Sequence, residues 1–243
     1  MVEQLVLTLD MDWASEAVLR FTAEALVRAG VRCTWFATHR SPVVEAISGR
    51  GDLFEVGVHP NCLSGSTHGQ GDGEVLQHMS ALFPGAVSMR THGLYQSTSF
   101  LAKAADAGIR HDVSLFLPGA AHLAPVRFCY NGANLVRFPY FWEDDVAMED
   151  PDESWSLAGH GAVPGLRIYD FHPVHVALNT TSLKGYRALK SLKPLPEWDE
   201  DFIEEHRHPG VGPLTLFLEL ADRLSGGGET ITGLAAQFEE PGL

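Results

Sequence analysis

The sequence contains few cysteines, and they are not arranged as a disulfide framework. Cys33, Cys62 and Cys129 are odd in number, widely spaced and without a Cys-x-x-Cys pair, which is typical of a reducing compartment. The N-terminus also lacks the basic region, apolar segment and small-residue cleavage site of a secretory signal. Both absences predict a cytoplasmic protein.

Basic charge and long apolar runs are scarce as well. There are 17 Lys and Arg residues against 31 Asp and Glu, which gives a formal net charge of −14. With no cluster of Lys and Arg, this balance argues against a nucleic-acid partner or an anionic membrane surface. The longest apolar runs, such as 212–220, are far short of the roughly 20 residues that span a bilayer. We therefore expect no membrane span.

Motifs of several common chemistries are missing too. The sequence has no Walker A motif, no Gly-x-Gly-x-x-Gly after a strand, no Gly-x-Ser-x-Gly elbow and no His-Glu-x-x-His. What is present is acidic charge in two segments. Residues 143–153 carry seven acids and residues 197–205 carry six, neither with a base. Both are typical of solvated loops, although the first begins directly after an aromatic run, FPYFW.

Short apolar strands alternate with amphipathic helices along the chain, which predicts an α/β protein built around a parallel sheet or barrel. There is no repeat and no linker, so a single domain over residues 1–243 is expected, with 143–165 and 184–211 the least regular stretches. The predicted strands are 4–9, 31–37, 53–58, 86–90, 109–114, 126–130, 135–140 and 166–171, and the predicted helices are 15–29, 42–48, 74–83, 97–107 and 213–224.

Chemically useful side chains stand where four of these strands end. In a parallel barrel the carboxyl ends of all strands meet at one face, and a borderline metal such as zinc accepts both carboxylates and imidazoles. Each residue alone has a simpler interpretation, such as Asp12 capping the next helix. Their joint placement favours a site. The residues are Asp10, Asp12, His59, Arg90, His92 and His172.

His175 follows His172 by three residues and could form a metal-binding pair with it. Side chains at that spacing after a strand more often diverge, so we do not expect the pair to form.

The order of these segments resembles the NodB-homology polysaccharide deacetylases, which are carbohydrate esterases. LTLDMDW (7–13) is similar to the family's aspartate motif, FEVGVHPN (54–61) to its Glu-x-Gly-x-His motif, and Ser88-Met89-Arg90 to the entry of its arginine motif. FPYFWEDD (138–145) and IYDFHP (168–173) resemble its fourth and last motifs. The resemblance implies a distorted, incomplete (β/α) barrel.

Two departures from the family pattern affect the metal site. One residue separates the aspartates, and Leu63 stands where the family usually has its second metal-binding histidine. His68 is the candidate replacement, and His92 is the alternative. The family's Arg-x-Pro-Tyr is here RTHGLY (90–95).

The resemblance implies a divalent metal, most simply Zn²⁺, with Co²⁺, Ni²⁺, Fe²⁺ or Mn²⁺ as alternatives, held by Asp12, His59 and His68. Such a metal polarises a carbonyl group and acidifies water.

The remaining roles also come from the resemblance. Asp10 is expected to act as general base with Arg90 as its partner. His172 is expected to act as general acid. Either Glu143 or Asp144 would keep it charged, and Asp144 is the one that we expect. The substrate contacts are expected at His92, Tyr95 and Trp142.

The implied activity is removal of an N- or O-acetyl group from a sugar or a polysaccharide precursor, which makes a small molecule or an oligosaccharide the expected partner. The acidic segments predict a neutral or amine-bearing sugar. Two alternatives stay open: an amidohydrolase of another small amide on the same barrel, and a catalytically silent sugar-binding relative. The sequence does not indicate the oligomeric state.

Overall fold

In the computed structural model, which describes residues 3–239, nine strands form one open sheet in the order β6-β7-β5-β4-β3-β2-β1-β9-β8. Every neighbouring pair is parallel except the β6–β7 hairpin. The sheet curls without closing, which confirms the incomplete barrel. The strands are β1 Glu3–Asp10, β2 Cys33–Ala37, β3 Phe54–Val58, β4 Ser88–Met89, β5 His111–Phe116, β6 Val126–Tyr130, β7 Ala133–Tyr140, β8 Trp142–Glu143 and β9 Gly165–Phe171.

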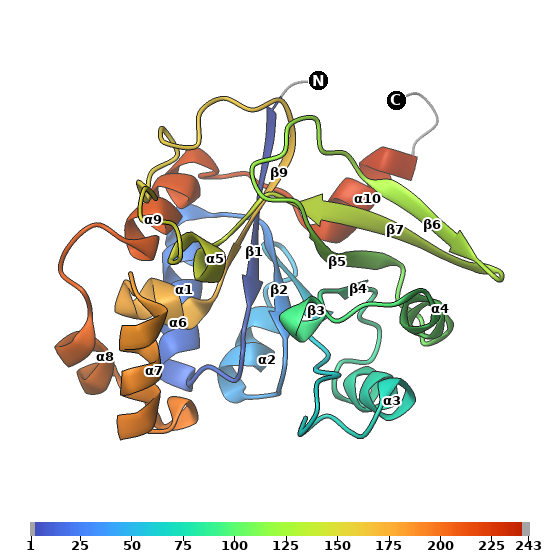
Figure 1. The fold of residues 1–243 in the computed structure, drawn as a ribbon, viewed down its shortest axis with the longest axis horizontal. Coiled ribbons are helices and arrows are strands. Elements are labelled where there is room, and N and C mark those ends of the chain that lie inside the picture. The colour runs from blue at the N-terminus through green and yellow to red at the C-terminus, as the bar shows by residue number, and fades with distance from the viewer. Residues whose placement is uncertain (1–2, 240–243) are drawn as a thin grey trace.

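Helices flank this sheet in two groups. Figure 1 shows α1, α6 and α9 together beside β1 and β9, and α3 and α4 together beside β3 to β5. The α-helices are α1 Glu16–Ala29, α2 Pro42–Ser48, α3 Asp72–Leu82, α4 Thr98–Asp106, α5 Asp144–Ala147, α6 Pro173–Leu178, α7 Leu183–Leu192, α8 Glu200–His206, α9 Pro213–Arg223 and α10 Ile231–Glu239. Short 3-10 turns lie at η1 His92–Leu94 and η2 Leu195–Glu197.

Capping residues set the helix boundaries where the sequence predicts them. The Ser15 hydroxyl accepts a hydrogen bond from the Val18 N–H at 3.3 Å, and Gly30 ends α1 in the left-handed conformation at φ 65°, which glycine adopts without steric cost. This start places α1 directly after the polar turn that follows β1. The cap therefore fixes where the turn that contains Asp12 ends.

One stretch is more regular than predicted. The segment 184–211 contains α7, η2 and α8. The hydroxyl of Ser182 accepts from the Gly185 N–H, and the carboxylate of Asp199 accepts from the Phe202 N–H, so each helix has its own N-cap. The acidic segment 197–205 is therefore largely helical, and the expectation of a solvated loop there was wrong.

The C-terminal helix is tied to the opposite end of the sheet from the candidate site. The Ile231 N–H donates to the Thr34 hydroxyl at 2.9 Å. The Thr232 N–H and hydroxyl donate to the two oxygens of Glu55 at 2.9 and 2.7 Å. These bonds satisfy a half-buried carboxylate near the start of β3.

Within the described residues, no helix combines the length and apolarity needed to cross a membrane. The division of the chain into a single domain stays a prediction.

Candidate active site

Four parallel strands deliver polar side chains to one edge of the sheet. Asp10 is the last residue of β1, His59 and Arg90 follow β3 and β4, and Asp170 lies near the end of β9. The strand register aligns these ends, since Thr8 pairs with Asp170 and Val58 with Met89. Asp10, His59, Arg90 and Asp170 are all buried. The sequence prediction that strand ends assemble one site agrees with this arrangement.

Asp12, His59 and His92 form a close group of three donor atoms. Asp12 Oδ1 lies 3.1 Å from His59 Nε2 and 3.0 Å from His92 Nδ1, and the two nitrogens are 3.3 Å apart. Ligands at about 2.0–2.1 Å from a tetrahedral zinc ion stand about 3.3–3.4 Å from one another. The donor set and its spacing therefore fit a zinc ion.

The electrostatics of Asp12 suit a metal ligand. Burial raises the pKa of Asp12, but the imidazoles of His59 and His92 outweigh it, and the pKa falls well below its usual value. The carboxylate is therefore ionised, as a ligand must be. Both Asp12 (φ 43°) and Trp13 (φ 55°) adopt left-handed backbone conformations, which cost energy for residues other than glycine.

This strained turn is held by two bonds, from the Ala14 N–H to the Met11 carbonyl at 2.8 Å and from the Trp13 N–H to the Thr38 hydroxyl at 3.0 Å.

His68, the predicted third ligand, lies near the three-donor group but is not part of it. Its Nδ1 accepts a hydrogen bond from the Asn61 N–H at 3.1 Å, and its ring stacks on His78. Burial lowers the pKa of His68 to about 4, so the ring is neutral. Its Nε2 is buried without a hydrogen-bond partner among the described residues. His92, and not His68, belongs to the three-donor group, and which of the two histidines binds a metal stays a prediction.

Arg90 is the centre of a buried polar network. Its Nη1 donates to Asp10 Oδ1 at 3.1 Å and also to Asp170 Oδ1. Its Nη2 donates to the Thr8 hydroxyl at 2.9 Å and its Nε to the Val113 carbonyl at 3.2 Å.

The rings of Phe36 and Tyr140 lie against the guanidinium, 4.8 and 4.5 Å from its central carbon. The predicted pairing of Arg90 with Asp10 is present.

Asp170 is the network member to which sequence reasoning gave no role. It is completely buried, and burial raises its pKa well above the usual value, although Arg90 opposes this shift. Its Oδ2 has no hydrogen-bond partner among the described residues. A signal was available, because Asp170 precedes His172 by two residues and side chains at that spacing share one face of a strand.

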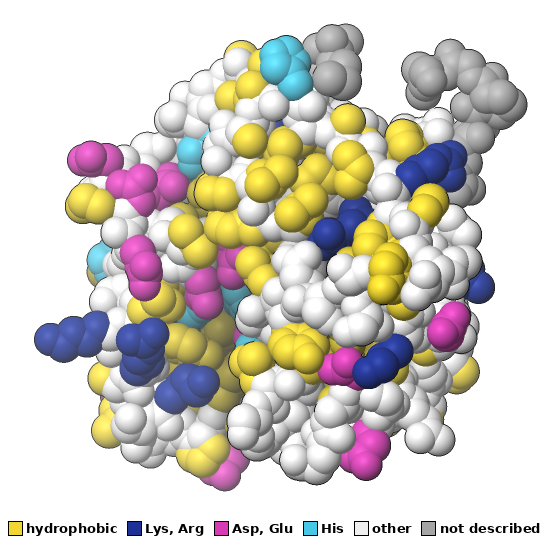
Figure 2. Space-filling model, turned by 45° about the vertical axis from the view of Figure 1, so that its right-hand side comes forward, with side chains coloured by type: hydrophobic (Ala, Val, Ile, Leu, Met, Phe, Trp, Pro, Cys, Tyr) yellow, Lys and Arg dark blue, Asp and Glu magenta, His cyan; other side chains and the backbone are white. Residues whose placement is uncertain are grey.

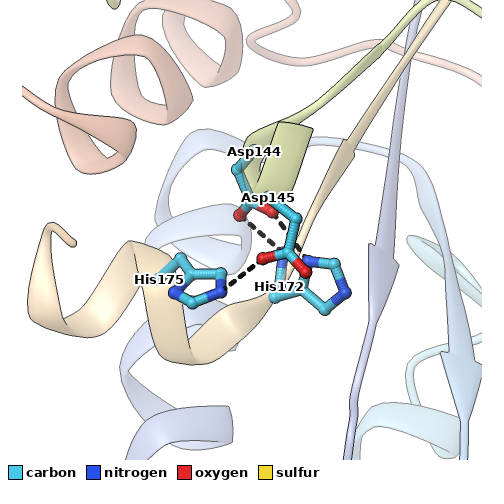
Figure 3. A group of neighbouring side chains, drawn as sticks. All are labelled: Asp144, Asp145, His172 and His175. Atoms are coloured by element: carbon cyan, nitrogen blue, oxygen red, sulfur yellow. Dashed lines mark hydrogen bonds and ion pairs between the residues drawn. The ribbon is translucent and has the colours of Figure 1, made fainter. Parts of the chain in front are cut away.

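His172 pairs with Asp144, as predicted. Asp144 Oδ1 lies 2.7 Å from His172 Nδ1, and its Oδ2 accepts from the His172 N–H at 2.8 Å (Figure 3). Burial lowers the pKa of His172, but the charges of Asp144 and Asp145 outweigh it and raise the pKa well above the usual value. The free Nε2 lies 3.6 Å from Asp12 Oδ2, so it faces the three-donor group.

A second acid–histidine pair stands beside the first. His175 Nε2 lies 2.7 Å from Asp145 Oδ1, and the rings of His172 and His175 are 5.5 Å apart (Figure 3). The expectation that these histidines diverge was wrong, because Pro173 starts α6 immediately and the helix turns His175 back toward His172.

Glu143 does not contact His172 directly but accepts from the Tyr140 hydroxyl, and burial raises its pKa.

The two aromatic residues expected to bind substrate differ in placement. Trp142 is buried, with its ring 4.9 Å from that of Phe171 and its Nε1–H donating to Glu153 at 3.1 Å. It therefore packs in the core, although it also lines a pocket with Phe116 and Glu143, and its assignment as a substrate contact stays a prediction. Tyr95 is half-buried and donates to Asp72 at 3.0 Å. Figure 2 shows acidic and histidine side chains within a hollow on the surface.

Comparison with known proteins gives one strong structural match. The chain is 37% identical to a Bordetella bronchiseptica protein of known crystal structure, over 90% of each chain, with a TM-score of 0.78. That protein is provisionally described as a polysaccharide deacetylase involved in O-antigen biosynthesis. A search of curated protein sequences gave no match.

Two distant structures share the fold alone. A 4-alpha-glucanotransferase from Thermococcus litoralis aligns with a TM-score of 0.55 at 11% identity, over 98% of this chain and 39% of that one. A protein from Mycobacterium smegmatis, also provisionally described as a polysaccharide deacetylase, aligns with a TM-score of 0.50 at 14% identity over 91% of each.

The sequence profile of the WbmS-like polysaccharide deacetylases matches residues 7–190. This range includes Asp10, His59, Arg90 and His172. Together with the 37% identity to the Bordetella protein, it shows that the chain belongs to the WbmS-like family of polysaccharide deacetylases.

Proposed function

We propose that this protein is a metal-dependent hydrolase that removes an N- or O-acetyl group from a sugar. The observation that carries the proposal is that a buried carboxylate and an imidazole whose pKa is raised both lie next to the three-donor group. Asp10 Oδ2 lies 3.6 Å from His59 Nδ1, and His172 Nε2 lies 3.6 Å from Asp12 Oδ2. Hydrolysis needs such a base and such an acid near one reacting carbon.

Asp12, His59 and His92 would hold the metal, with Zn²⁺ the best fit to one carboxylate and two imidazoles. A bound zinc ion would polarise the acetyl carbonyl group and acidify the attacking water. His59 Nε2 lies 3.1 Å from Asp12 Oδ1, so it is the nitrogen that faces the proposed metal position, while Nδ1 is buried without a hydrogen-bond partner among the described residues.

Asp10 is the proposed general base. Arg90 holds Oδ1, which leaves Oδ2 to take one proton from the water that attacks the acetyl carbon. The guanidinium keeps the carboxylate ionised and oriented without itself contacting substrate.

His172 is the proposed general acid. Its Nδ1 is held by Asp144, so Nε2 presents its proton to the leaving nitrogen or oxygen as the bond to the acetyl carbon breaks. The products are acetic acid, which ionises to acetate, and the free amine or alcohol of the sugar. Asp10 then gives its proton to solvent, and His172 regains one from solvent.

Acetate release from acetylated amino sugars, measured together with the metal content of the purified protein, tests this proposal. Asp10→Asn should abolish turnover and retain metal, whereas His59→Ala should lose the metal. Ring-opening of cyclic amides without acetate release would instead indicate an amidohydrolase. Failure to bind zinc or cobalt would indicate a sugar-binding relative without activity.

A further inference from the structure

Helix α7 carries an unusual concentration of positive charge for this acidic chain. Residues 183–193 contain four of the 17 Lys and Arg residues and no acid. Three of them, Lys184, Arg187 and Lys190, recur every third residue on the exposed side of the helix. At 1.5 Å rise per residue, they cover about 9 Å along the axis. The expectation that the sequence has no basic cluster was therefore wrong.

These three side chains are exposed and free of ion pairs. Among the described residues, no carboxylate lies within ion-pair distance of Lys184, Arg187 or Lys190, although Lys193 at the end of the helix pairs with Asp199 at 2.7 Å. The Lys190 ammonium lies 5.1 Å from the centre of the Tyr186 ring. Three unpaired cations side by side repel one another, so nothing in the fold itself explains the arrangement.

Tyr186 attaches this basic face to the candidate active site. Its ring packs edge-on against His175, 4.7 Å between centres, and His175 in turn lies 5.5 Å from His172. The ring also contacts Trp198, at 6.1 Å. Helix α7 lies at the lower left of Figure 1. In the turned view of Figure 2, Lys and Arg side chains gather at the lower left, beside the hollow that contains acidic and histidine side chains. The basic face therefore forms one rim of the site.

We propose that Lys184, Arg187 and Lys190 of α7 bind an anionic part of the substrate that adjoins the acetylated sugar. The inference rests on the proposed deacetylase function and assigns its substrate class. The length of the basic face suits a group with more than one negative charge, such as a diphosphate linkage or the carboxylates of uronic acid residues. This replaces the expectation, drawn from the two acidic segments, that the substrate is neutral or amine-bearing.

The test compares acetate release from three probes of different charge. An acetylated chitooligosaccharide is neutral, a hyaluronan oligosaccharide places a uronate beside each acetylated sugar, and UDP-N-acetylglucosamine carries a diphosphate. The variant combines Lys184→Gln, Arg187→Gln and Lys190→Gln. The control combines Arg28→Gln, Arg127→Gln and Arg223→Gln, which are also exposed and produce the same change in net charge away from α7.

For at least one charged probe, the α7 variant should show a KM raised roughly tenfold with kcat unchanged. Each exposed ion pair between α7 and the substrate contributes only modestly to the binding free energy. High salt should weaken wild-type binding in the same way, since it screens exposed charges. The neutral probe and the control variant should show no change. The charged probe that responds identifies the anion as a diphosphate or a uronate.

Equal KM values for wild type and the α7 variant, or an equal rise with the neutral probe, would overturn the inference while leaving the deacetylase proposal intact. If no probe releases acetate, the deacetylase proposal is the one that fails. Calorimetric binding of the charged probes, lost in the α7 variant only, would still support the anion site, and binding that the substitutions leave unchanged would overturn it. Binding to anionic vesicles that the variant loses, with KM unaffected, would assign α7 to a lipid surface instead.

Discussion

Replacing Arg90 by methionine should destabilise the protein strongly, and the loss should depend on pH. Arg90 is fully buried and is the cation that faces both Asp10 and Asp170. Methionine can fill much of the space between the rings of Phe36 and Tyr140 but leaves two buried carboxylates without the guanidinium that both of them contact. Removing one partner of a buried pair typically costs about 3–5 kcal/mol, which for a chain of this size lowers Tm by roughly 6–20 °C.

The sign of the pH dependence follows from Asp170. Burial already raises its pKa with Arg90 present, and loss of the cation raises the pKa further. A carboxyl group with a raised pKa in the folded state favours folding below its unfolded pKa of about 3.9, and this advantage disappears as pH rises through the folded value. The destabilisation of Arg90→Met relative to wild type should therefore be largest at neutral pH and smaller at about pH 5.

Thermal denaturation followed by circular dichroism measures both effects. Arg90→Lys keeps the charge but loses the forked set of hydrogen-bond donors, so its Tm should lie between those of wild type and Arg90→Met. Adding Asp170→Asn to Arg90→Met should recover part of the loss, because it removes one unpaired carboxylate. A loss below about 1 kcal/mol, or a loss equal at both pH values, would refute the view that Arg90 compensates buried charge.

Three further predictions concern the candidate site. His92→Ala should lower zinc affinity by at least about 100-fold, whereas His68→Ala should retain the metal. Elemental analysis of both variants decides between the histidines. Loss of zinc in His68→Ala but not in His92→Ala would identify His68 as the ligand. Asp144→Asn removes a charge that raises the pKa of His172, so the alkaline limb of the plot of kcat/KM against pH should move to lower pH. If this limb does not move, His172 is not the general acid. Asp10→Asn should lower kcat by about 10²–10⁴-fold with zinc content unchanged, and near-full activity would exclude Asp10 as the base.

The strand-end residues could be predicted because a parallel sheet gives every strand the same direction. Asp10, His59, Arg90 and His172 needed only the strand pattern and the rule that carboxyl ends meet. The choice between His68 and His92 could not be made in this way. It depends on the path of the 59–69 loop, in which the Asn61 N–H bond ties up His68, and on the η1 turn that aims His92 at Asp12.

The partners that lie beside these residues were harder to foresee. Asp170 shares a strand face with His172, but its raised pKa depends on burial, which a sequence does not state. The Asp145–His175 pair depends on α6 starting directly at Pro173 and on the acidic segment folding back against it. The net charge of −14 likewise gave no sign of the basic face of α7, because a net charge does not tell where along the chain the charged residues lie.

The bonds from α10 to Glu55 and Thr34 bear on how the chain folds. They join residues separated by 177 and 197 positions, so β2 and β3 cannot complete their polar contacts until nearly the whole chain has left the ribosome. Contacts of such long range slow folding, because the entropy of closing the intervening loop must be overcome first. The end of the sheet remote from the chemistry should therefore be the last part to become protected from hydrogen exchange during refolding.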